Sequence, residues 1–315
     1  MKVDLTTRIK GLTFKNPITV ASGTFGTTDE YGRYVDYKKL GAIITKTITV
    51  KPREGNPMPR ICETTAGMLN AIGLQNKGLE DFIIHKIPYF KKIGTPLIVS
   101  VAGETVQEFA ELARVFEKHR DVVSALEVNL SCPNVEAGGV NFMKKQERIL
   151  EAIKAVRQRT SLTVFAKLSP ELGDVLEIAG KVLGEGADGI SVTNTLRGMA
   201  VDIDSRRSKL AKDFGGLSGP AIKPVALRYV YQVKKEFKVP VIASGGISDV
   251  DDALEFLIVG ADLLAVGTAN FVEPRATLEI LEGIKRFCAK QGIKKLDELR
   301  GSYRPCGDSK KGCHR

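Results

Sequence analysis

The sequence predicts a (β/α)8 barrel, and three observations support this fold class. First, eight short apolar runs rich in β-branched residues recur along the 315 residues, with amphipathic stretches between them. Second, these runs are continuous rather than alternating, which is typical of parallel strands covered on both faces. Third, no long polar linker interrupts the series, and distinctive motifs follow both the first and the last run. A doubly wound open sheet is the alternative, and the strand count and the motifs at both ends disfavour it.

The elements are predicted in chain order. Strands are expected at residues 18–22, 41–49, 97–102, 125–130, 163–168, 189–194, 239–244 and 262–267. Helices are expected at residues 106–119, 147–160, 174–184, 220–237 and 249–259, among other amphipathic stretches. Residues 1–16 should form a small hairpin ahead of the barrel, and residues 301–315 a frayed polar tail. The whole chain, residues 1–315, is expected to be one domain.

Two connections are longer than a single helix requires. Residues 50–96 contain three prolines in their first half, which is therefore expected to be an ordered loop over the barrel mouth. Residues 195–219 form the second long connection, and they are rich in Arg, Lys and Gly.

Composition excludes several classes of protein. Lys and Arg outnumber Asp and Glu by 47 to 37, but they are spread along the chain without a nucleic-acid-binding motif, so a solvated basic surface is preferred and no nucleic-acid partner is expected. No run of about 18 apolar residues predicts a membrane span, and the N-terminus does not resemble a signal peptide. The five cysteines are scattered and odd in number, which favours reduced thiols in a cytoplasmic enzyme.

The active site of a (β/α)8 barrel lies at the carboxyl ends of its strands. In chain order the residues there are Ala21-Ser22-Gly23, Thr45-Lys46-Thr47, Ser100, Asn129 followed by Cys132, Lys167, Thr193-Asn194-Thr195, Ser244-Gly245-Gly246 and Val266-Gly267-Thr268. This set holds no His, Asp or Glu, which argues against a metal site and against carboxylate-pair or Ser-His-Asp hydrolysis. Hydride chemistry on a bound organic cofactor does not need these groups.

Two glycine-containing turns predict a phosphate site. Gly245, Gly246, Gly267 and Thr268 follow the last two strands, where this fold commonly binds phosphate through backbone N–H groups. The alternative is that these are only tight turns, which also favour glycine. The formal G-x-G-x-x-G match at residues 184–189 precedes a strand instead of following one, so it does not predict a dinucleotide site.

Lys46 and Lys167 are both flanked by apolar strand residues. A lysine in such a place is costly unless it is paired or functional. Each could form a Schiff base, hold an anion or face an electron-rich cofactor ring, and the alternative is a side chain that extends out of the barrel to water.

The segment Asn129-Leu130-Ser131-Cys132-Pro133-Asn134 places a thiol between two amides just after the fourth strand. Amides can orient a planar, amide-rich ligand through paired donor and acceptor contacts, and a thiol can act as a base or a nucleophile. The alternative is a half-buried structural cysteine.

Together these residues resemble the dihydroorotate dehydrogenase family, flavoproteins of pyrimidine synthesis. The resemblance covers most of the barrel. It rests on Ala21-Ser22-Gly23, Lys46-Thr47, residues 70–76, residues 129–135, Ala166-Lys167-Leu168-Ser169, Asn194-Thr195, residues 216–220, Ser244-Gly245-Gly246 and Val266-Gly267-Thr268. It implies an FMN-binding (β/α)8 barrel, in agreement with the strand pattern.

The resemblance also implies a subclass. Cysteine at position 132 resembles the soluble classes, whereas the membrane-associated, quinone-linked class has serine there. Residues 134–139 resemble the NAD-linked class (class 1B) rather than the fumarate-linked one. In that class a homodimer pairs with an electron-transfer subunit carrying FAD and an iron–sulfur cluster to form a heterotetramer, and this chain lacks the cysteine clusters to hold such a cluster itself. Ser100 departs from the family pattern, in which Asn is expected near the flavin.

The resemblance assigns a role to each site residue. Cys132 would remove a proton from carbon 5 of dihydroorotate while hydride leaves carbon 6 for FMN. The substrate would be held by Lys46, Asn70, Ala71, Ile72, Gly73, Leu74, Asn129, Asn134, Asn194 and Thr195. FMN would be held by Ala21, Ser22, Lys46, Thr47, Ser100, Asn129, Lys167, Thr193, Gly219, Gly245, Gly246, Gly267 and Thr268. The alternatives are an FMN barrel acting on another dihydropyrimidine and a barrel that binds a phosphorylated ligand without redox chemistry.

Overall fold

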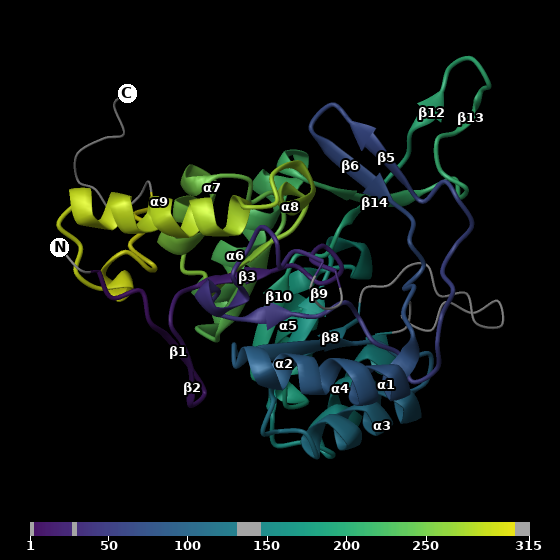
Figure 1. Ribbon diagram of the computed structural model, residues 1–315, viewed down its shortest axis with the longest axis horizontal. Coiled ribbons are helices and arrows are strands. Elements are labelled where there is room, and N and C mark those ends of the chain that lie inside the picture. The colour runs from purple at the N-terminus through teal and green to yellow at the C-terminus, as the bar shows by residue number, and fades with distance from the viewer. Residues whose placement is uncertain (1–2, 27–29, 131–145, 306–315) are drawn as a thin grey trace.

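The computed structural model describes residues 3–26, 30–130 and 146–305. Eight parallel strands form one sheet that curls into a barrel (Figure 1). Their spatial order is β3 (Ile18–Val20), β16 (Leu263–Val266), β15 (Val241–Ser244), β10 (Gly189–Val192), β9 (Thr163–Leu168), β8 (Val123–Asn129), β7 (Leu97–Val101) and β4 (Ile43–Ile44). The first and last strands of this order meet where the Gly41 N–H donates to the Ile18 carbonyl at 2.8 Å. The predicted (β/α)8 fold is confirmed.

Strand β4 is the largest departure from the predicted strand boundaries. Only Ile43–Ile44 pairs as a regular strand, although residues 41–49 were expected to do so. The following residues still run beside β7, since Thr45 N donates to Ile98 O at 3.1 Å and Ile48 N donates to Ser100 O at 2.9 Å. The chain therefore leaves the regular ladder as it enters the barrel mouth, and this carries residues 45–47 over the site.

The interior of the barrel changes from apolar to polar along β7, β8 and β9. Its lower layer includes Ile98, Ala125 and Phe165, which belong to one buried apolar cluster. Side chains two residues further on the same strands share the same face, because strand side chains alternate with a period of two. The residues in those positions are Ser100, Glu127 and Lys167, all buried. The polar layer is therefore built directly on the apolar one.

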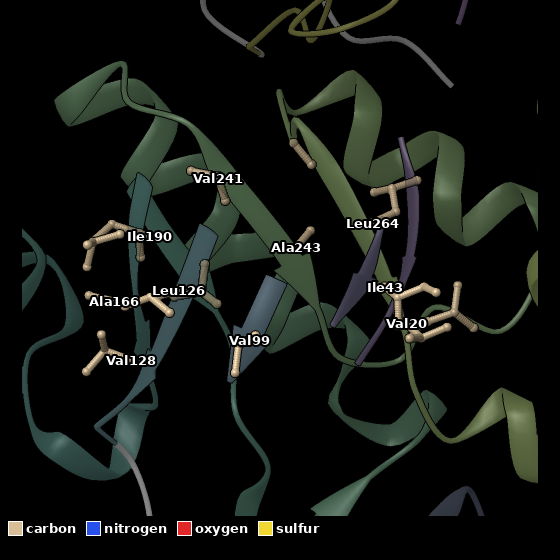
Figure 2. Close-up of a cluster of buried hydrophobic side chains, with 14 of the residues drawn as sticks. Val20, Ile43, Val99, Leu126, Val128, Ala166, Ile190, Val241, Ala243 and Leu264 are labelled. Carbon is tan, nitrogen blue, oxygen red and sulfur yellow. The ribbon is translucent and has the colours of Figure 1, made fainter. Parts of the chain in front are cut away.

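The outer face of the sheet packs against helices. Its side chains include Val20, Ile43, Val99, Leu126, Val128, Ala166, Ile190, Val241, Ala243 and Leu264 (Figure 2), and they form one cluster with the buried faces of the helices. The helices are α1 (Gly78–Asp81), α2 (Ile87–Ile93), α3 (Val106–Glu117), α4 (Gln146–Arg157), α5 (Val175–Gly184), α6 (Lys223–Phe237), α7 (Val250–Ile258), α8 (Ala269–Val272) and α9 (Ala276–Lys290). A π-helical turn, η2 (Phe82–Lys86), joins α1 to α2. The predicted helix 220–237 begins with a 3-10 turn, η5 (Pro220–Ile222).

The expected N-terminal hairpin is present as β1 (Thr7–Ile9) and β2 (Leu12–Phe14). Ile9 and Phe14 are buried in the same apolar cluster as the lower layer of the barrel interior. The hairpin therefore packs against the end of the barrel opposite the site. Of the predicted tail, residues 301–305 carry no regular helix or strand, and residues 306–315 lie outside the described residues.

Both long connections contain strands, and this corrects the expectation that the first half of residues 50–96 is an ordered loop. The first contains β5 (Ile61–Thr64) and β6 (Gly67–Asn70), and the second contains β11 (Leu196–Gly198) and β14 (Gly215–Ser218). These strands form one antiparallel sheet in the order β11-β14-β6-β5. A further hairpin, β12 (Val201–Asp202) with β13 (Arg207–Ser208), projects from it at the upper right of Figure 1. The pairing joins segments about 150 residues apart, since Ser218 lies opposite Met68, so no local pattern predicts it.

We predict that Gly41→Ala lowers the free energy of unfolding by about 1–3 kcal/mol, as overpacked sites do. A Cβ atom at Gly41 would lie 1.9 Å from the Asn16 carbonyl oxygen, so the joint between β3 and β4 would have to open. Chemical denaturation measures the change.

Gly184→Ala is the matched control, because a Cβ atom there meets nothing within 4 Å. We expect its effect to lie within about 1 kcal/mol of zero. Equal unfolding free energies for the two variants would contradict the account of barrel closure.

Candidate active site

Thr47 is the centre of a hydrogen-bonded polar network at the carboxyl ends of the strands. Its hydroxyl oxygen lies 3.0 Å from the Ser22 hydroxyl and 3.0 Å from the Ser100 hydroxyl. Ser100 is fully buried, and its backbone N–H donates to the Thr45 hydroxyl at 3.1 Å. Three successive strand ends are therefore fixed relative to one another by side chains as well as by the sheet.

Two asparagines extend this network across the barrel mouth. The Asn129 Nδ2 lies 3.5 Å from the Thr47 hydroxyl, at the long limit of a hydrogen bond. The Asn194 Nδ2 donates to Asn129 Oδ1 at 3.3 Å, and Asn194 Oδ1 accepts from the Thr195 N–H at 2.9 Å. The amides thus have defined orientations, which is what recognition of a planar ligand by paired donors and acceptors requires.

Lys46 lies beside the turn that follows β3. A Cβ atom built on Gly23, whose φ is +86°, would lie only 3.3 Å from Lys46 Nζ. Gly23 therefore leaves room for the ammonium group as well as adopting a left-handed conformation. The half-buried Lys46 brings a positive charge to the same side of the mouth as Ser22 and Thr47.

The small antiparallel sheet brings a second set of predicted residues to the mouth. Asn70, at the end of β6, donates through Nδ2 to the Gly216 carbonyl of β14 at 3.2 Å. A Cβ atom on Gly216 would lie 2.2 Å from the Thr195 hydroxyl and 3.4 Å from Asn70 Nδ2. Asn70 and Thr195, 125 positions apart in the sequence, therefore meet across one glycine.

Residues 71–74 follow β6 as an ordered turn. The Asn56 side chain donates to the Ala71 carbonyl at 2.9 Å, and the Asn56 N–H donates to the Ile72 carbonyl at 3.0 Å. Gly73 and Leu74 both have left-handed backbones, with φ values of +76° and +57°. The predicted substrate-binding residues are therefore held to the preceding loop by hydrogen bonds from Asn56 to their main-chain carbonyls.

A buried ion pair lies below the amides. Lys167 Nζ is 3.4 Å from Glu127 Oε1, and Ser191 donates to Glu127 Oε2 at 2.9 Å. Glu127 is fully buried and the Lys167 side chain is 6% exposed. Lys167 thus does not extend out of the barrel to water. Its charge is kept inside the barrel by a carboxylate that the sequence analysis did not assign to the site.

The two predicted phosphate turns present backbone donors. Within the described part of the chain, the N–H groups of Gly245, Gly246, Gly267 and Thr268 donate to no protein acceptor. Gly246 is buried, and unpaired buried N–H groups are rare unless a ligand or water satisfies them. Gly245 and Gly246 have φ values of +119° and +76°, which turn the chain sharply after β15. This donor set fits a phosphate group.

Gly219 lies against the same region. Its φ is +94°, and a Cβ atom there would lie 2.6 Å from the Gly67 Cα and 3.6 Å from the Thr268 Cγ2. Thr268 in turn donates through its hydroxyl to Ser218 at 2.8 Å. The small sheet and the turn after β16 are therefore in contact beside the candidate phosphate site.

Two further predicted residues, Ala21 and Thr193, are hydrogen-bonded to neighbouring strand ends. Ala21 is buried, and its N–H donates to the Val266 carbonyl at 2.8 Å. Thr193 exchanges hydrogen bonds with Ser244, whose hydroxyl donates to the Thr193 carbonyl at 2.9 Å. Cys132 and Asn134, the predicted base and one of the predicted substrate amides, lie outside the described residues.

Comparison with known proteins identifies the family. The family model for dihydroorotate dehydrogenase matches residues 4–288. The chain is 49% identical over 302 residues to a protein of Desulforamulus reducens, a match that covers 96% of this chain and 99% of the relative. A protein of Alkaliphilus metalliredigens is 48% identical and one of Trichlorobacter lovleyi 49% identical, with the same coverage. All three are named dihydroorotate dehydrogenase B (NAD(+)), catalytic subunit.

The chain belongs to the dihydroorotate dehydrogenase family. The match spans nearly the whole chain, so the barrel and the small sheet over its mouth both fall within the family. The family resemblance predicted from the strand-end motifs is confirmed.

The described residues of this dihydroorotate dehydrogenase family member contain no group of three or more His, Cys, Asp or Glu side chains placed to hold a metal ion. Over the same residues, no helix has the length and apolarity that crossing a membrane requires.

Glu127 was not among the predicted site residues, because it lies in the middle of its strand and only strand-end residues were predicted to form the site. The available signal was a carboxylate flanked by Leu126 and Val128 in an otherwise apolar strand. Such a residue is buried only when it is paired. Because Lys167 lies opposite Asn129 in the β8–β9 register, the predicted lysine and Glu127 share the inner face.

We predict that Glu127→Gln lowers the free energy of unfolding by about 3 kcal/mol, because the buried Lys167 charge loses its carboxylate partner. The substitution keeps the side-chain volume, so the loss reports charge and not packing. Denaturant unfolding of both proteins checks it.

Glu282→Gln serves as the control, because Glu282 forms an exposed pair with Lys285. We expect its unfolding free energy to change by less than about 0.5 kcal/mol. A Glu127→Gln protein as stable as this control would argue against a buried pair of structural importance.

Proposed function

We propose that this protein catalyses the flavin-dependent oxidation of dihydroorotate to orotate in pyrimidine biosynthesis, with electrons passed to NAD through a partner subunit. The observation that carries the proposal is the hydrogen-bonded network of Thr47, Asn129 and Asn194 at the barrel mouth, beside backbone N–H groups that have no protein acceptor among the described residues. The names of the relatives support the reaction and the NAD linkage.

FMN is the proposed cofactor. Gly245, Gly246, Gly267 and Thr268 would bind its phosphate through backbone N–H groups, with Gly219 beside them. The remaining contacts would come from Ala21, Ser22, Lys46, Thr47, Ser100, Asn129, Lys167 and Thr193. Ser100 would contribute a hydroxyl where the family resemblance leads us to expect an amide. Lys167 would keep positive charge near the ring, where reduction adds negative charge.

Substrate recognition would rest on one cation and several amides. Lys46 would hold the carboxylate of dihydroorotate, since a charge-assisted contact is stronger than a neutral one. Asn70, Asn129, Asn134 and Asn194 would bind the ring amides, and the other residues of 70–74 with Thr195 would shape the pocket around them.

The reaction removes two hydrogens from adjacent carbons. Cys132 would accept the proton from carbon 5, and the electron pair of that C–H bond becomes part of the new carbon–carbon double bond. Bound FMN supplies the acceptor for the hydride from carbon 6. The amides would hold the substrate in place while the thiolate removes the proton.

The relatives are named catalytic subunits, which supports a partner for this chain as well. We propose a homodimer of this single-domain barrel, joined to an electron-transfer subunit that carries FAD and an iron–sulfur cluster. We place the assembly in the cytoplasm, where the free thiols of Cys62 and Cys288 are kept reduced.

A carboxylate substrate distinguishes this proposal from a barrel acting on another dihydropyrimidine. Dihydrouracil lacks the carboxylate that Lys46 would bind, so dihydroorotate should be turned over and dihydrouracil should not. Comparable turnover of both would favour the broader dihydropyrimidine activity. A purified protein without flavin absorbance, even after FMN is added, would favour a non-redox barrel that binds a phosphorylated ligand.

We predict that turnover rises with pH through the titration of the Cys132 thiol. A free thiol has a pKa of about 8.5 and is mostly protonated at neutral pH, so the fraction of thiolate, the form able to accept a proton, grows as pH increases. Steady-state rates across this range, with chemistry limiting, measure the effect. A flat profile would count against Cys132 as the base.

We predict that Cys132→Ala retains bound flavin and substrate affinity but loses at least about 100-fold in turnover, the lower range for loss of a general base. Cys132→Ser should also be slow, because a hydroxyl ionises far less readily than a thiol. Full activity of Cys132→Ala would overturn the assignment while leaving the flavin site intact.

A further inference from the structure

The Gly245–Gly246 turn rests directly on the start of α6. A Cβ atom on Gly246 would lie 2.8 Å from the Lys223 backbone N and Cα atoms, and one on Gly245 would lie 3.0 Å from the Ala226 Cβ. Helix α6 begins at Lys223, so its first turn forms the back of the candidate phosphate site. Any movement of this turn would displace the backbone donors of the site.

The Lys223 side chain does not point its charge at this site. Its Nζ donates to Asp252 Oδ1 at 2.6 Å and to Glu255 Oε1 at 2.8 Å, both on α7. Burial lowers the pKa of Lys223, but the hydrogen bonds and charges of Asp252 and Glu255 outweigh it and hold the pKa above its ordinary value. The lysine is thus a permanent cation that ties α6 to α7.

Asp252 makes one contact that Glu255 does not. Its second oxygen, Oδ2, accepts the backbone N–H of Ser248 at 2.9 Å. Ser248 lies two residues after Gly246, on the far side of the same turn. The Asp252 N–H is itself bonded to Asp249 Oδ1 at 2.9 Å, which caps the start of α7. The Asp252 side chain is 13% exposed, whereas that of Glu255 is 45% exposed.

These contacts form a closed chain that begins and ends at the turn containing Gly246. It runs from the Lys223 backbone against Gly246, through the Lys223 side chain to Asp252, and back through Ser248 to the turn. Both ends of the turn are thereby fixed by one carboxylate. None of these side chains belongs to the polar network around Thr47.

We infer that Asp252 is a positioning residue for the phosphate site, holding the Gly245–Ser248 turn so that its N–H groups converge on the phosphate of the cofactor. The inference rests on the proposed function, because it assumes that the bound group is FMN. If Asp252 has this role and not a merely structural one, its substitution should lower the affinity only for a ligand that carries the phosphate.

The test compares FMN with riboflavin, which lacks the phosphate, on the flavin-free full-length protein. Affinities are measured by quenching of flavin fluorescence for the wild type, Asp252→Asn and Glu255→Gln. Asn at position 252 keeps the volume but has one acceptor oxygen, so either Lys223 or Ser248 faces an amide N–H2. Glu255→Gln perturbs the same lysine without touching Ser248, and it is the matched control.

The wild type should bind FMN more tightly than riboflavin. Asp252→Asn should lower the ratio of FMN affinity to riboflavin affinity about tenfold, the size expected for one charge-assisted hydrogen bond. Its affinity for riboflavin should be unchanged. Glu255→Gln should change this ratio by no more than about twofold, since the ion pair it breaks is half exposed.

Three results would overturn the inference. If Asp252→Asn keeps the wild-type ratio of FMN to riboflavin affinity, or if both variants lower it equally, Asp252 does not position the phosphate site. Either result would leave the proposed flavin site unaffected. A wild type that does not distinguish FMN from riboflavin would overturn the phosphate site itself, and the inference with it.

Discussion

The site depends on polar groups buried inside a barrel, and the free-energy cost of burying them is offset where they hydrogen-bond to one another. Burying an unpaired polar group costs about 1–3 kcal/mol, and an unpaired charge costs more. Here Glu127 is matched by Lys167 and Ser191, and Thr47 is matched by Ser22 and Ser100. The barrel can therefore become polar two residues above its apolar layer without losing its order.

The same constraint explains why the unpaired donors matter. The side chains around Thr47 and Glu127 are hydrogen-bonded to one another, whereas the backbone N–H groups of Gly245 and Gly246 have no protein acceptor among the described residues. Because an unpaired buried N–H group is costly, an anionic ligand would stabilise the structure most at these donors. On the proposed function, the polar network would recognise the ligand's ring, and the two turns would bind its charged end.

Many of the site residues could be predicted from the sequence because parallel strands share one property. Their carboxyl ends all meet at the same end of the barrel, so Ser22, Thr47, Asn129 and Asn194 could be grouped without knowing any contact. The strand limits at β4 were wrong because the chain leaves the regular ladder there while still following β7. Local apolar character does not distinguish a regular strand from a segment held by single bridges.

The remainder could not be predicted because it depends on long-range pairing. The sheet formed by β6 and β14 joins two connections that look like loops when each is considered alone. Glu127 becomes part of the site only once the β8–β9 register is known. Asp252 lies on a surface helix, and its contact with Ser248 is visible only in three dimensions. Cys132 and Asn134 lie outside the described residues, and their roles stay predictions.

The central claim is that this barrel mouth transfers hydride from dihydroorotate to a bound flavin. The most direct measurement is the flavin absorbance of the FMN-loaded protein after anaerobic addition of dihydroorotate, without NAD. The account predicts rapid bleaching of the flavin with formation of an equal amount of orotate. An oxidised flavin spectrum that does not change, in a protein shown to bind both FMN and dihydroorotate, would contradict it.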